Sequence, residues 1–319
     1  MMQEQTTTGL IADIGGTNAR FSLVSPGVAE AQSPLVLACG DYPGLAEAAE
    51  AYLEAVAPPV RPRHGAFAIA SPVLGDQIAF TNSNWSFSIS ALRDRLELER
   101  LEVVNDFTAV ALSVPLLADE DKVAVGGGVP TFGAPIAILG PGTGLGVATL
   151  MAAKTGWRPI PTEGGHATMA AVDEKEASVL AWLRGRFGHV SAERVLSGPG
   201  LTNLHQAISD LAGRPTSGLA PHEVSKLALE GDALAIETQD MFFSMLGTFT
   251  GNLALLSGAR GGVVIAGGIV PHLLDAFLAS AFRRRFEDKG RFRSYLEAIP
   301  VHVITHRYPA FIGLRGLIG

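Results

Sequence analysis

Cysteine is nearly absent from this chain, since Cys39 is the single one among 319 residues. One cysteine excludes an internal disulfide and any zinc site that needs three or four cysteine ligands. Positive charge is also scarce, because 24 lysines and arginines stand against 31 aspartates and glutamates, which gives a net charge of −7. We therefore expect no nucleic-acid partner, no membrane partner and a reducing, cytoplasmic location.

Long apolar runs and targeting signals are missing as well. Residues 123–153 carry no charge, yet glycines and prolines interrupt them throughout, so they cannot form one membrane-spanning helix. The first eight residues are polar and lack the basic and apolar regions of a signal peptide. Hydrophobic residues, at 47%, and 37 glycines are what the chain has in abundance. This composition is typical of a compact α/β enzyme, and the length allows two domains.

Two glycine-rich turns, each set between apolar runs, are the most informative feature of the sequence. The first contains Gly15, Gly16 and Thr17, and the second contains Gly142 and Thr143. Glycine lets the backbone bend sharply and approach a ligand closely. Backbone N–H groups in such turns form an anion-binding nest, to which threonine hydroxyls add donors. The two turns predict a site that holds a nucleoside triphosphate from two sides. Two ordinary glycine hairpins are the alternative.

Two common phosphate-binding motifs do not fit these turns. A Walker A loop requires a lysine that neither turn contains. A dinucleotide fingerprint requires a helix after its glycines, whereas residues 147–151, which follow the second turn, are apolar and rich in strand-forming types. Strand–turn–strand is therefore the better interpretation of both segments. Their likeness also suggests an ancient duplication.

Strands alternate with helices along the rest of the chain. This order predicts an open sheet with crossover connections. The expected strands cover residues 9–24 (a hairpin), 33–38, 66–70, 101–104, 136–150 (a hairpin), 262–266 and 301–305. The expected helices cover residues 43–56, a segment beginning at Ser90, 107–117, 232–256 and 309–317, and most of the chain after residue 173 is expected to be helical.

Asp106 is the first candidate for chemistry. It follows the expected strand 101–104 and precedes the expected helix 107–117, the place where open α/β sheets present ligand-binding groups. A carboxylate there could accept a proton from a substrate hydroxyl, a general-base contribution of about 10²–10⁴-fold. It could equally cap the helix that follows. The residues alone leave both interpretations open.

A second candidate group lies around residues 163–166. Glu163 and His166 flank two glycines, so both side chains can reach one ligand from a loop. A zinc-peptidase motif does not fit, because no histidine precedes the glutamate and the glycines disfavour a helix. A carboxylate beside an imidazole suits a polyhydroxylated ligand, and a glycine turn with solvated ends is the alternative. Glu193, taken alone, is better explained as an exposed residue on a helix.

Taken together, these segments resemble the bacterial ATP-dependent glucokinases, within the sugar kinase/actin/Hsp70 superfamily. The matching segments span nearly the whole chain and cover residues 13–21, 105–110, 140–146, 163–166, 193–200 and 266–268. The hexokinase-type branch fits better than the ROK branch, whose cysteine cluster has no counterpart in residues 167–171. The resemblance implies an α/β, RNase H-like (actin-like) ATPase fold with two domains around a cleft. The small domain would comprise residues 1–112 completed by 301–319, and the large domain residues 113–300.

The resemblance also implies a role for each candidate residue. ATP and Mg²⁺ would be the cofactors, Asp13 would orient the Mg²⁺-bound phosphates through water, and no direct protein ligand of the metal is assigned. Nucleotide contacts are implied for Gly15, Gly16, Thr17, Asn18, Gly142, Thr143, Gly267 and Gly268. Sugar contacts are implied for Asn105, Asp106, Glu163, His166 and Glu193, with Asn82 at the edge of the sugar cleft. Asp106 would deprotonate the sugar 6-hydroxyl. A homodimer is implied by the resemblance only.

The activity implied is transfer of the ATP γ-phosphoryl group to glucose, the entry step of glycolysis. A kinase for another hexose or an N-acetylhexosamine is an alternative, because Ala167, Thr168 and Met169 replace an acidic or aromatic residue that is usual after this histidine. A non-catalytic sugar sensor is a second alternative, against which the early first strand argues by leaving no room for a DNA-binding module. An actin-like ATPase switch is a third, and the Glu163, His166 and Glu193 group argues against it.

Overall fold

A computed structural model describes residues 9–25, 31–80, 84–154, 156–216 and 218–318. The chain forms two compact units, a first unit of residues 1–117 with 306–319 and a second unit of residues 118–305. Each unit contains a mixed sheet with helices packed against it, which confirms the predicted α/β class. No helix within the described ranges combines the length and the apolar character that crossing a bilayer requires.

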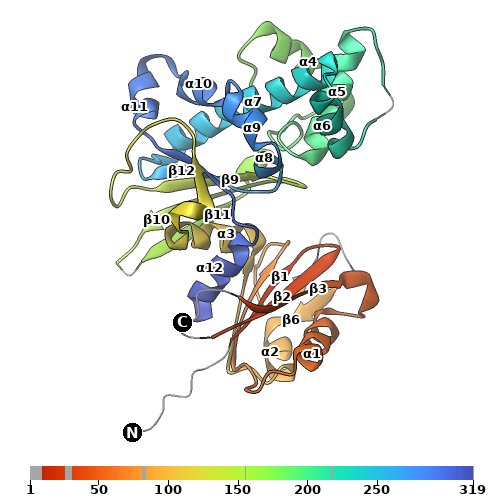
Figure 1. Ribbon diagram of the computed structural model, residues 1–319, viewed down its shortest axis with the longest axis vertical. Coiled ribbons are helices and arrows are strands. Elements are labelled where there is room, and N and C mark those ends of the chain that lie inside the picture. Colours follow the sequence, from red (N-terminus) through yellow and green to blue (C-terminus); the bar gives the residue numbers. More distant parts are fainter. Residues whose placement is uncertain (1–8, 26–30, 81–83, 155, 217, 319) are drawn as a thin grey trace. The chain divides into compact units, whose positions relative to one another are not determined.

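The first unit is built on a five-stranded sheet with the order β3-β2-β1-β4-β7 (Figure 1). Strands β1, β2 and β3 are antiparallel neighbours, whereas β1, β4 and β7 are parallel. The elements are β1 (Gly9–Ile14), β2 (Asn18–Val24), β3 (Gln32–Ala38), α1 (Leu45–Val56), β4 (His64–Ile69), β5 (Gln77–Ala79), β6 (Ser86–Ser88), α2 (Ile89–Arg95), β7 (Arg100–Asn105), α3 (Asp106–Ser113) and α12 (Pro309–Ile318), with single 3₁₀ turns at Cys39–Asp41 and Val114–Leu116.

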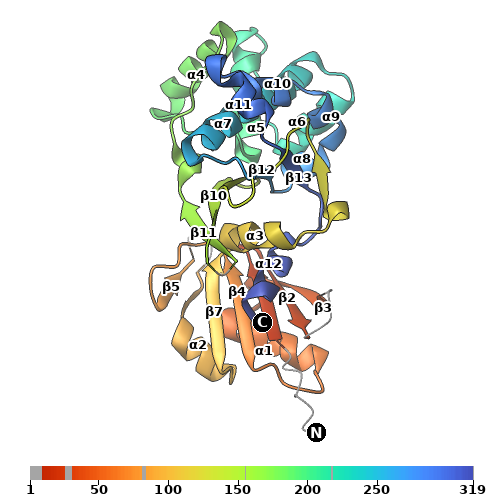
Figure 2. The same ribbon diagram turned by 90° about the vertical axis from the view of Figure 1, so that its left-hand side faces the viewer.

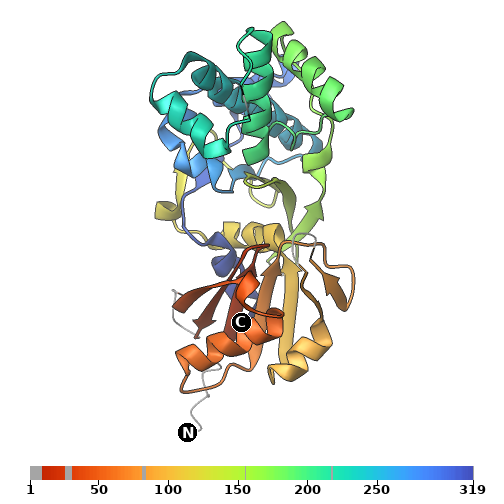
Figure 3. The same ribbon diagram turned by 90° about the vertical axis from the view of Figure 1, so that its right-hand side faces the viewer.

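Helices cover both faces of this sheet. Helices α1 and α2 pack on one face around Phe21, Tyr52 and Phe67, and Figure 3 shows both helices on the same side of the strands. Helices α3 and α12 pack on the other face, where they lie side by side (Figures 1 and 2). Gly313 of α12 approaches the Ala109 carbonyl of α3 so closely that a Cβ would overlap it. Close backbone contact therefore holds these two helices together.

The second unit is built on a six-stranded sheet with the order β11-β10-β9-β12-β13-β8. Helices α4, α5, α7 and α10 lie on the same side of this sheet (Figure 1), where they enclose the largest apolar core. The elements are β8 (Lys122–Ala124), β9 (Ile136–Pro141), β10 (Leu145–Ala152), β11 (Trp157–Thr162), α4 (Glu174–Phe187), α5 (Gly198–Leu211), α6 (Pro221–Leu229), α7 (Ala233–Ser257), β12 (Gly262–Ile265), α8 (Ile269–His272), α9 (Leu274–Ala279), α10 (Phe282–Glu287), α11 (Arg293–Glu297) and β13 (Val301–Ile304), with 3₁₀ turns at Asp119–Asp121, Gly164–His166 and Gly290–Phe292.

Two expectations from the sequence differ from the structure. The predicted small domain, residues 1–112 with 301–319, differs from the first unit at both boundaries. The unit extends to residue 117, and β13 pairs with β12 and β8 in the second unit, which leaves residues 306–319 with the first. The predicted start of a helix at Ser90 is also shifted. Ser88 is the N-cap of α2, because its hydroxyl accepts the Ala91 N–H, while the Ser90 N–H donates to Asp76. Each difference arises from pairing with residues distant in sequence.

Candidate functional site

The turn between β1 and β2 is held by backbone hydrogen bonds. The Gly15 N–H donates to the Asn18 carbonyl at 2.9 Å, and the Cys39 N–H donates to the Thr17 carbonyl at 2.8 Å. The Cys39 thiol faces the Gly15 carbonyl at 3.5 Å. The turn predicted to bind phosphate is thus supported by Cys39, the residue that follows β3.

Asp13 lies near the end of β1, directly opposite Arg20 of β2 in the strand register. One oxygen of its carboxylate accepts from Arg20 Nη1 at 3.2 Å. Burial raises the pKa of Asp13, and the adjacent guanidinium only partly offsets that rise. The sequence pattern singled out Asp13 but gave Arg20 no role, although pairing across a hairpin of known turn length places the two side chains on one face.

Asp106 is the first residue of α3, and the residue before it caps that helix. The Asn105 side-chain oxygen accepts from the N–H groups of Phe107, at 3.0 Å, and Thr108, at 3.3 Å. Asp106 Oδ1 accepts from the Phe107 N–H at 2.7 Å. The interpretation of Asp106 as the N-cap is therefore wrong. Burial raises the pKa of Asp106 to about 6, and the nearby charge of Asp13 adds to that rise against the hydrogen bond from Phe107.

Asp13 and Asp106 line one cavity of about 540 Å³ within the first unit. Two cations, Arg20 and Arg307, line it as well. Its remaining wall is mainly apolar and consists of Val36, Phe107, Val110, Tyr308, Pro309, Ala310 and Phe311. Two carboxylates of raised pKa beside two guanidinium groups suit a ligand that brings both a hydroxyl and a phosphate. Arg307 follows a strand of the other unit, so no local pattern in the sequence could have placed it here.

The turn between β9 and β10 in the second unit is held by one hydrogen bond within the turn and by another from the first residue of α5. The Gly142 N–H donates to the Gly144 carbonyl, and the Gly198 N–H donates to the Gly142 carbonyl, both at 2.8 Å. Gly267 has a φ of +80° and approaches the Pro141 carbonyl so closely that a Cβ would overlap it. The structure therefore brings the segment of Gly267 and Gly268 against the turn that contains Gly142 and Thr143, as a single nucleotide-binding surface requires.

Glu163, His166 and Glu193 form a cluster in the same unit. His166 Nε2 lies 3.9 Å from a Glu163 oxygen, and His166 Nδ1 lies 3.9 Å from a Glu193 oxygen. Gly165 makes the cluster possible, because it contacts the Leu145 carbonyl where a Cβ would overlap. Glu193 lies in a turn before α5, so its interpretation as a helix-surface residue is wrong. All three side chains keep exposed surface available to a polyhydroxylated ligand.

Magnesium fits the donors of the first unit's cavity. Mg²⁺ usually keeps several waters and binds through one or two carboxylates together with substrate phosphates. The partly exposed Asp13 carboxylate offers such an oxygen beside the glycine turn. Within the described part of the chain, no group of three or more histidine, cysteine, aspartate or glutamate side chains could hold a metal ion alone. Asn82, implied at the edge of the sugar site, lies outside the described residues.

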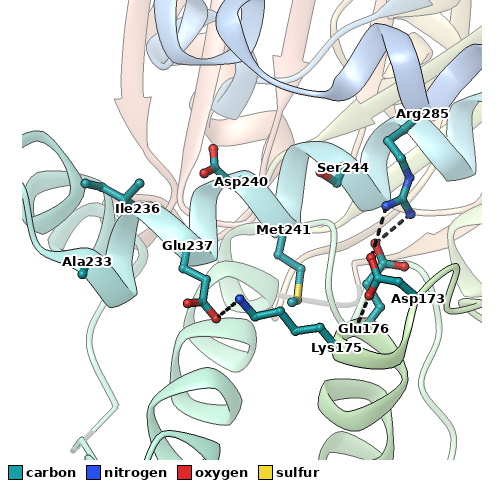
Figure 4. A pocket seen from close by; sticks show the side chains of 10 residues that line it. All are labelled: Asp173, Lys175, Glu176, Ala233, Ile236, Glu237, Asp240, Met241, Ser244 and Arg285. Carbon is teal, nitrogen blue, oxygen red and sulfur yellow. Dashed lines mark hydrogen bonds and ion pairs between the residues drawn. The ribbon is translucent and has the colours of Figure 1, made fainter.

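A second cavity, of about 390 Å³, lies within the second unit beside α4 and α7 (Figure 4). Its buried charges satisfy one another. Arg285 Nη2 contacts Glu176 at 2.7 Å and also donates to the Thr248 hydroxyl, while the Val172 N–H donates to the other Glu176 oxygen. Lys175 pairs with Glu237 at 2.8 Å across the opening (Figure 4). This cavity is a structural ion-pair site and lacks the glycine turns that mark the candidate site.

Known proteins of one family resemble this chain in sequence and in fold. A family model described as "Glucokinase" matches residues 10–318. A glucokinase of Paramagnetospirillum magneticum is 55% identical over 311 residues, which cover 97% of each chain. The crystal structure of a glucokinase from an Antarctic psychrotroph superposes with a TM-score of 0.91 at 35% identity, covering 98% of this chain and 99% of the other. A Balamuthia mandrillaris glucokinase solved with glucose shares the fold, with a TM-score of 0.81 at 18% identity, covering 100% of this chain and 95% of the other.

Proposed function

This chain belongs to the glucokinase family and is an ATP-dependent hexose kinase with an actin-like ATPase fold, and from that premise we propose how its residues transfer the ATP γ-phosphoryl group to the 6-hydroxyl of glucose. The observation that carries the proposal is the shared cavity of Asp106 and Asp13. One carboxylate is poised to accept a proton, and the other lies beside a phosphate-binding turn.

Asp106 acts as the general base. Its carboxylate accepts the proton of the 6-hydroxyl as that oxygen attacks phosphorus, and the bond from phosphorus to the ADP oxygen breaks. A pKa of about 6 leaves Asp106 mostly ionised at neutral pH, yet makes it a better proton acceptor than an ordinary aspartate. The Phe107 N–H, which donates to one oxygen of Asp106, fixes the orientation of the carboxylate.

Glycine segments in each unit suit contact with a nucleotide. Gly16, Thr17 and Asn18 donate to phosphate oxygens from the first turn, and Thr143 from the second. The N–H groups of Gly15 and Gly142 already donate within their turns, so these two glycines act by letting the backbone approach the phosphates closely. Gly267 and Gly268 let adenine and ribose lie against the backbone. Asp13 would hold Mg²⁺ beside the first turn, and the metal would neutralise phosphate charge there. Positioning and charge stabilisation then account for most of the catalysis, since phosphoryl transfer needs little covalent assistance.

The sugar is recognised by groups that match its hydroxyls. Glu163, His166 and Glu193 supply acceptors and an imidazole from the second unit. The side-chain oxygen of Asn105 already accepts from the N–H groups of Phe107 and Thr108 at the start of α3. Asn105 therefore offers the sugar its side-chain amide N–H groups. A sugar without one of these hydroxyls leaves a polar group unpaired, and that loss gives specificity.

Three finer assignments belong to the same proposal. The chain lies in the branch outside the ROK proteins, because residues 167–171, after His166, contain no cysteine. It works in the cytoplasm, since a single buried cysteine suits a reducing compartment. It forms a homodimer, for which the family resemblance is the support, and light scattering coupled to size-exclusion chromatography measures that state directly.

A sugar panel tests the reaction itself. ADP release from Mg²⁺-ATP is measured with glucose, mannose, fructose, N-acetylmannosamine and no sugar. We expect strong turnover with glucose and little without sugar. Higher kcat/KM with another sugar would move the assignment to that hexose. ATP hydrolysis indifferent to every sugar would indicate an ATPase switch, and nucleotide-independent glucose binding without turnover would indicate a sensor.

A further inference from the structure

Glu193 contacts the turn that we assign to the nucleotide as well as the cluster that we assign to the sugar. Its Oε2 accepts from the Leu145 N–H at 2.9 Å, and Leu145 is the first residue after the 142–144 turn. Its Oε1 lies 3.9 Å from His166 Nδ1. One carboxylate thus presents a separate oxygen to each site.

The backbone around Glu193 links the same two segments. The Glu193 N–H donates to the Gly165 carbonyl at 2.9 Å, next to His166. The Glu193 carbonyl accepts from the Ser197 hydroxyl at 2.7 Å, and the following residue, Gly198, donates to the Gly142 carbonyl. Residues 193–198 therefore contact the turn at both of its ends. A displacement of Glu193 changes the support of the turn and the sugar cluster together.

We propose that Glu193 is a positioning residue that couples sugar binding to nucleotide binding. A sugar hydroxyl bound at Oε1 holds the carboxylate in the orientation in which Oε2 keeps the 142–144 turn ordered for phosphate. This inference rests on the proposed function. Because both ligands favour one arrangement of Glu193, each tightens the binding of the other by the same factor.

Gly144 offers a way to displace the Glu193 carboxylate without replacing Glu193 itself. A Cβ at this position would lie 2.6 Å from Glu193 Oε2, the end of a flexible side chain. Gly144→Ala therefore moves the carboxylate away from Leu145 while Glu163 and His166 remain. Gly142→Ala is the matched control in the same turn, since a Cβ there meets nothing within 4 Å.

The test measures the Kd of a non-hydrolysable ATP analogue with Mg²⁺ by calorimetry, with and without saturating glucose. In the wild type we expect glucose to lower this Kd by about fivefold or more, a usual size for coupling between sites. In Gly144→Ala the ratio of the two Kd values should fall toward one. In Gly142→Ala both Kd values should rise and their ratio should stay at the wild-type value. A wild-type ratio in Gly144→Ala, or a ratio of one in the wild type, overturns the proposal.

Two substitutions of Glu193 itself test the proposal even if the Gly144→Ala variant does not fold. Both weaken glucose binding, because both alter a sugar contact. Glu193→Gln keeps the length and an acceptor for the Leu145 N–H, so the Kd ratio should persist. Glu193→Asp withdraws the acceptor by one methylene, so the ratio should fall. Equal ratios in the two variants contradict the coupling. A wild type that turns over no glucose refutes the proposed function instead, which separates the two failures.

Discussion

Five strands of the second sheet repeat the strand order of the first sheet, and β8 is added at the edge beyond β13. The two sheets differ in the side chains beside their central hairpins. In each, three antiparallel strands are joined to two further parallel strands, as β3-β2-β1-β4-β7 and as β11-β10-β9-β12-β13. In each, three residues form the turn between the first two strands, Gly15–Thr17 in one and Gly142–Gly144 in the other. This agreement supports the duplication that the two glycine turns suggested.

The two hairpins differ in the second cross-strand residue pair, counted from each turn. In the first unit the second pair from the turn is Asp13 with Arg20, and in the second unit it is Gly140 with Gly146. The first turn thus has charged side chains on the strands that flank it, whereas the second has glycines there and receives the charge of Glu193 from another segment. The same scaffold places two carboxylates, Asp13 and Asp106, around a cavity in one unit and pairs two glycines beside the turn in the other.

Removal of Asp106 should give the largest effect, because we place the proton transfer in the first unit. Asp106→Ala should lower kcat by at least about 10²-fold while the affinity for nucleotide stays nearly unchanged. Steady-state kinetics and nucleotide titration measure the two quantities. Asp94→Ala, an exposed carboxylate on α2 of the same unit, is the control. Near-wild-type turnover in Asp106→Ala would remove the general base from this unit.

Loss of charge in the second unit's cluster should act on binding instead. Glu163→Gln should raise KM for glucose by roughly tenfold or more, the usual cost of a hydrogen bond to a charged group, with little change in kcat. Steady-state kinetics at varied glucose concentration measure both quantities. The control is Glu230→Gln, which changes an exposed glutamate at the end of α6. An unchanged KM with a collapsed kcat would assign chemistry to both units and break the contrast.

The pH dependence of the wild type should report the first unit's base. A base must be ionised, so kcat/KM for glucose should fall about tenfold per pH unit below the pKa of Asp106, which is about 6. The measurement is a pH–rate profile between pH 4.5 and about 8, a window set by that pKa, with enzyme stability checked at each point. A profile that stays flat through pH 6 would disagree with this assignment.

The contact between α3 and α12 allows a structural test of the first unit. Gly313→Ala places a Cβ against the Ala109 carbonyl, so the free energy of unfolding should drop by about 1–3 kcal/mol. Gly316→Ala in the same helix faces only the flexible end of Leu116 and should be neutral or slightly stabilising. Urea unfolding compares the pair. Equal effects of the two substitutions would show that α12 does not close this unit by backbone contact.

The smallest effect should be a gain in stability that accompanies loss of the base. The folded state raises the pKa of Asp106 from an ordinary 3.8 to about 6, so ionisation of Asp106 destabilises the fold as pH rises through that interval. Asp106→Asn should therefore raise the free energy of unfolding at pH 8, on the order of 1 kcal/mol, and should give little or no gain near pH 4. Urea titrations at both pH values decide this, and a loss at pH 8 would contradict it.

Much of the candidate site could be predicted because its motifs are local. Glycine turns, the strands beside them and the strand–helix junction at Asp106 all depend on neighbours in sequence, so their residue types predict their conformation. The structure agrees at β1–β2, β9–β10, α7 and α12. The alternative role of Asp106 as helix cap was wrong because Asn105, which precedes it, can also cap, and the backbone orientation decides which of the two residues does so.

Composition, turn chemistry and strand periodicity by themselves determined the α/β class, the two glycine turns and three candidates for chemistry, Asp106, Glu163 and His166. Asn105 and Glu193 became candidates only through the family resemblance. Only the tertiary structure decided that Asp13 and Asp106 share a cavity with Arg307, that β13 joins the second sheet, and that Glu193 supports the 142–144 turn. The reason is physical. Burial, pairing and a raised pKa come from residues far apart in sequence, and packing alone brings them together.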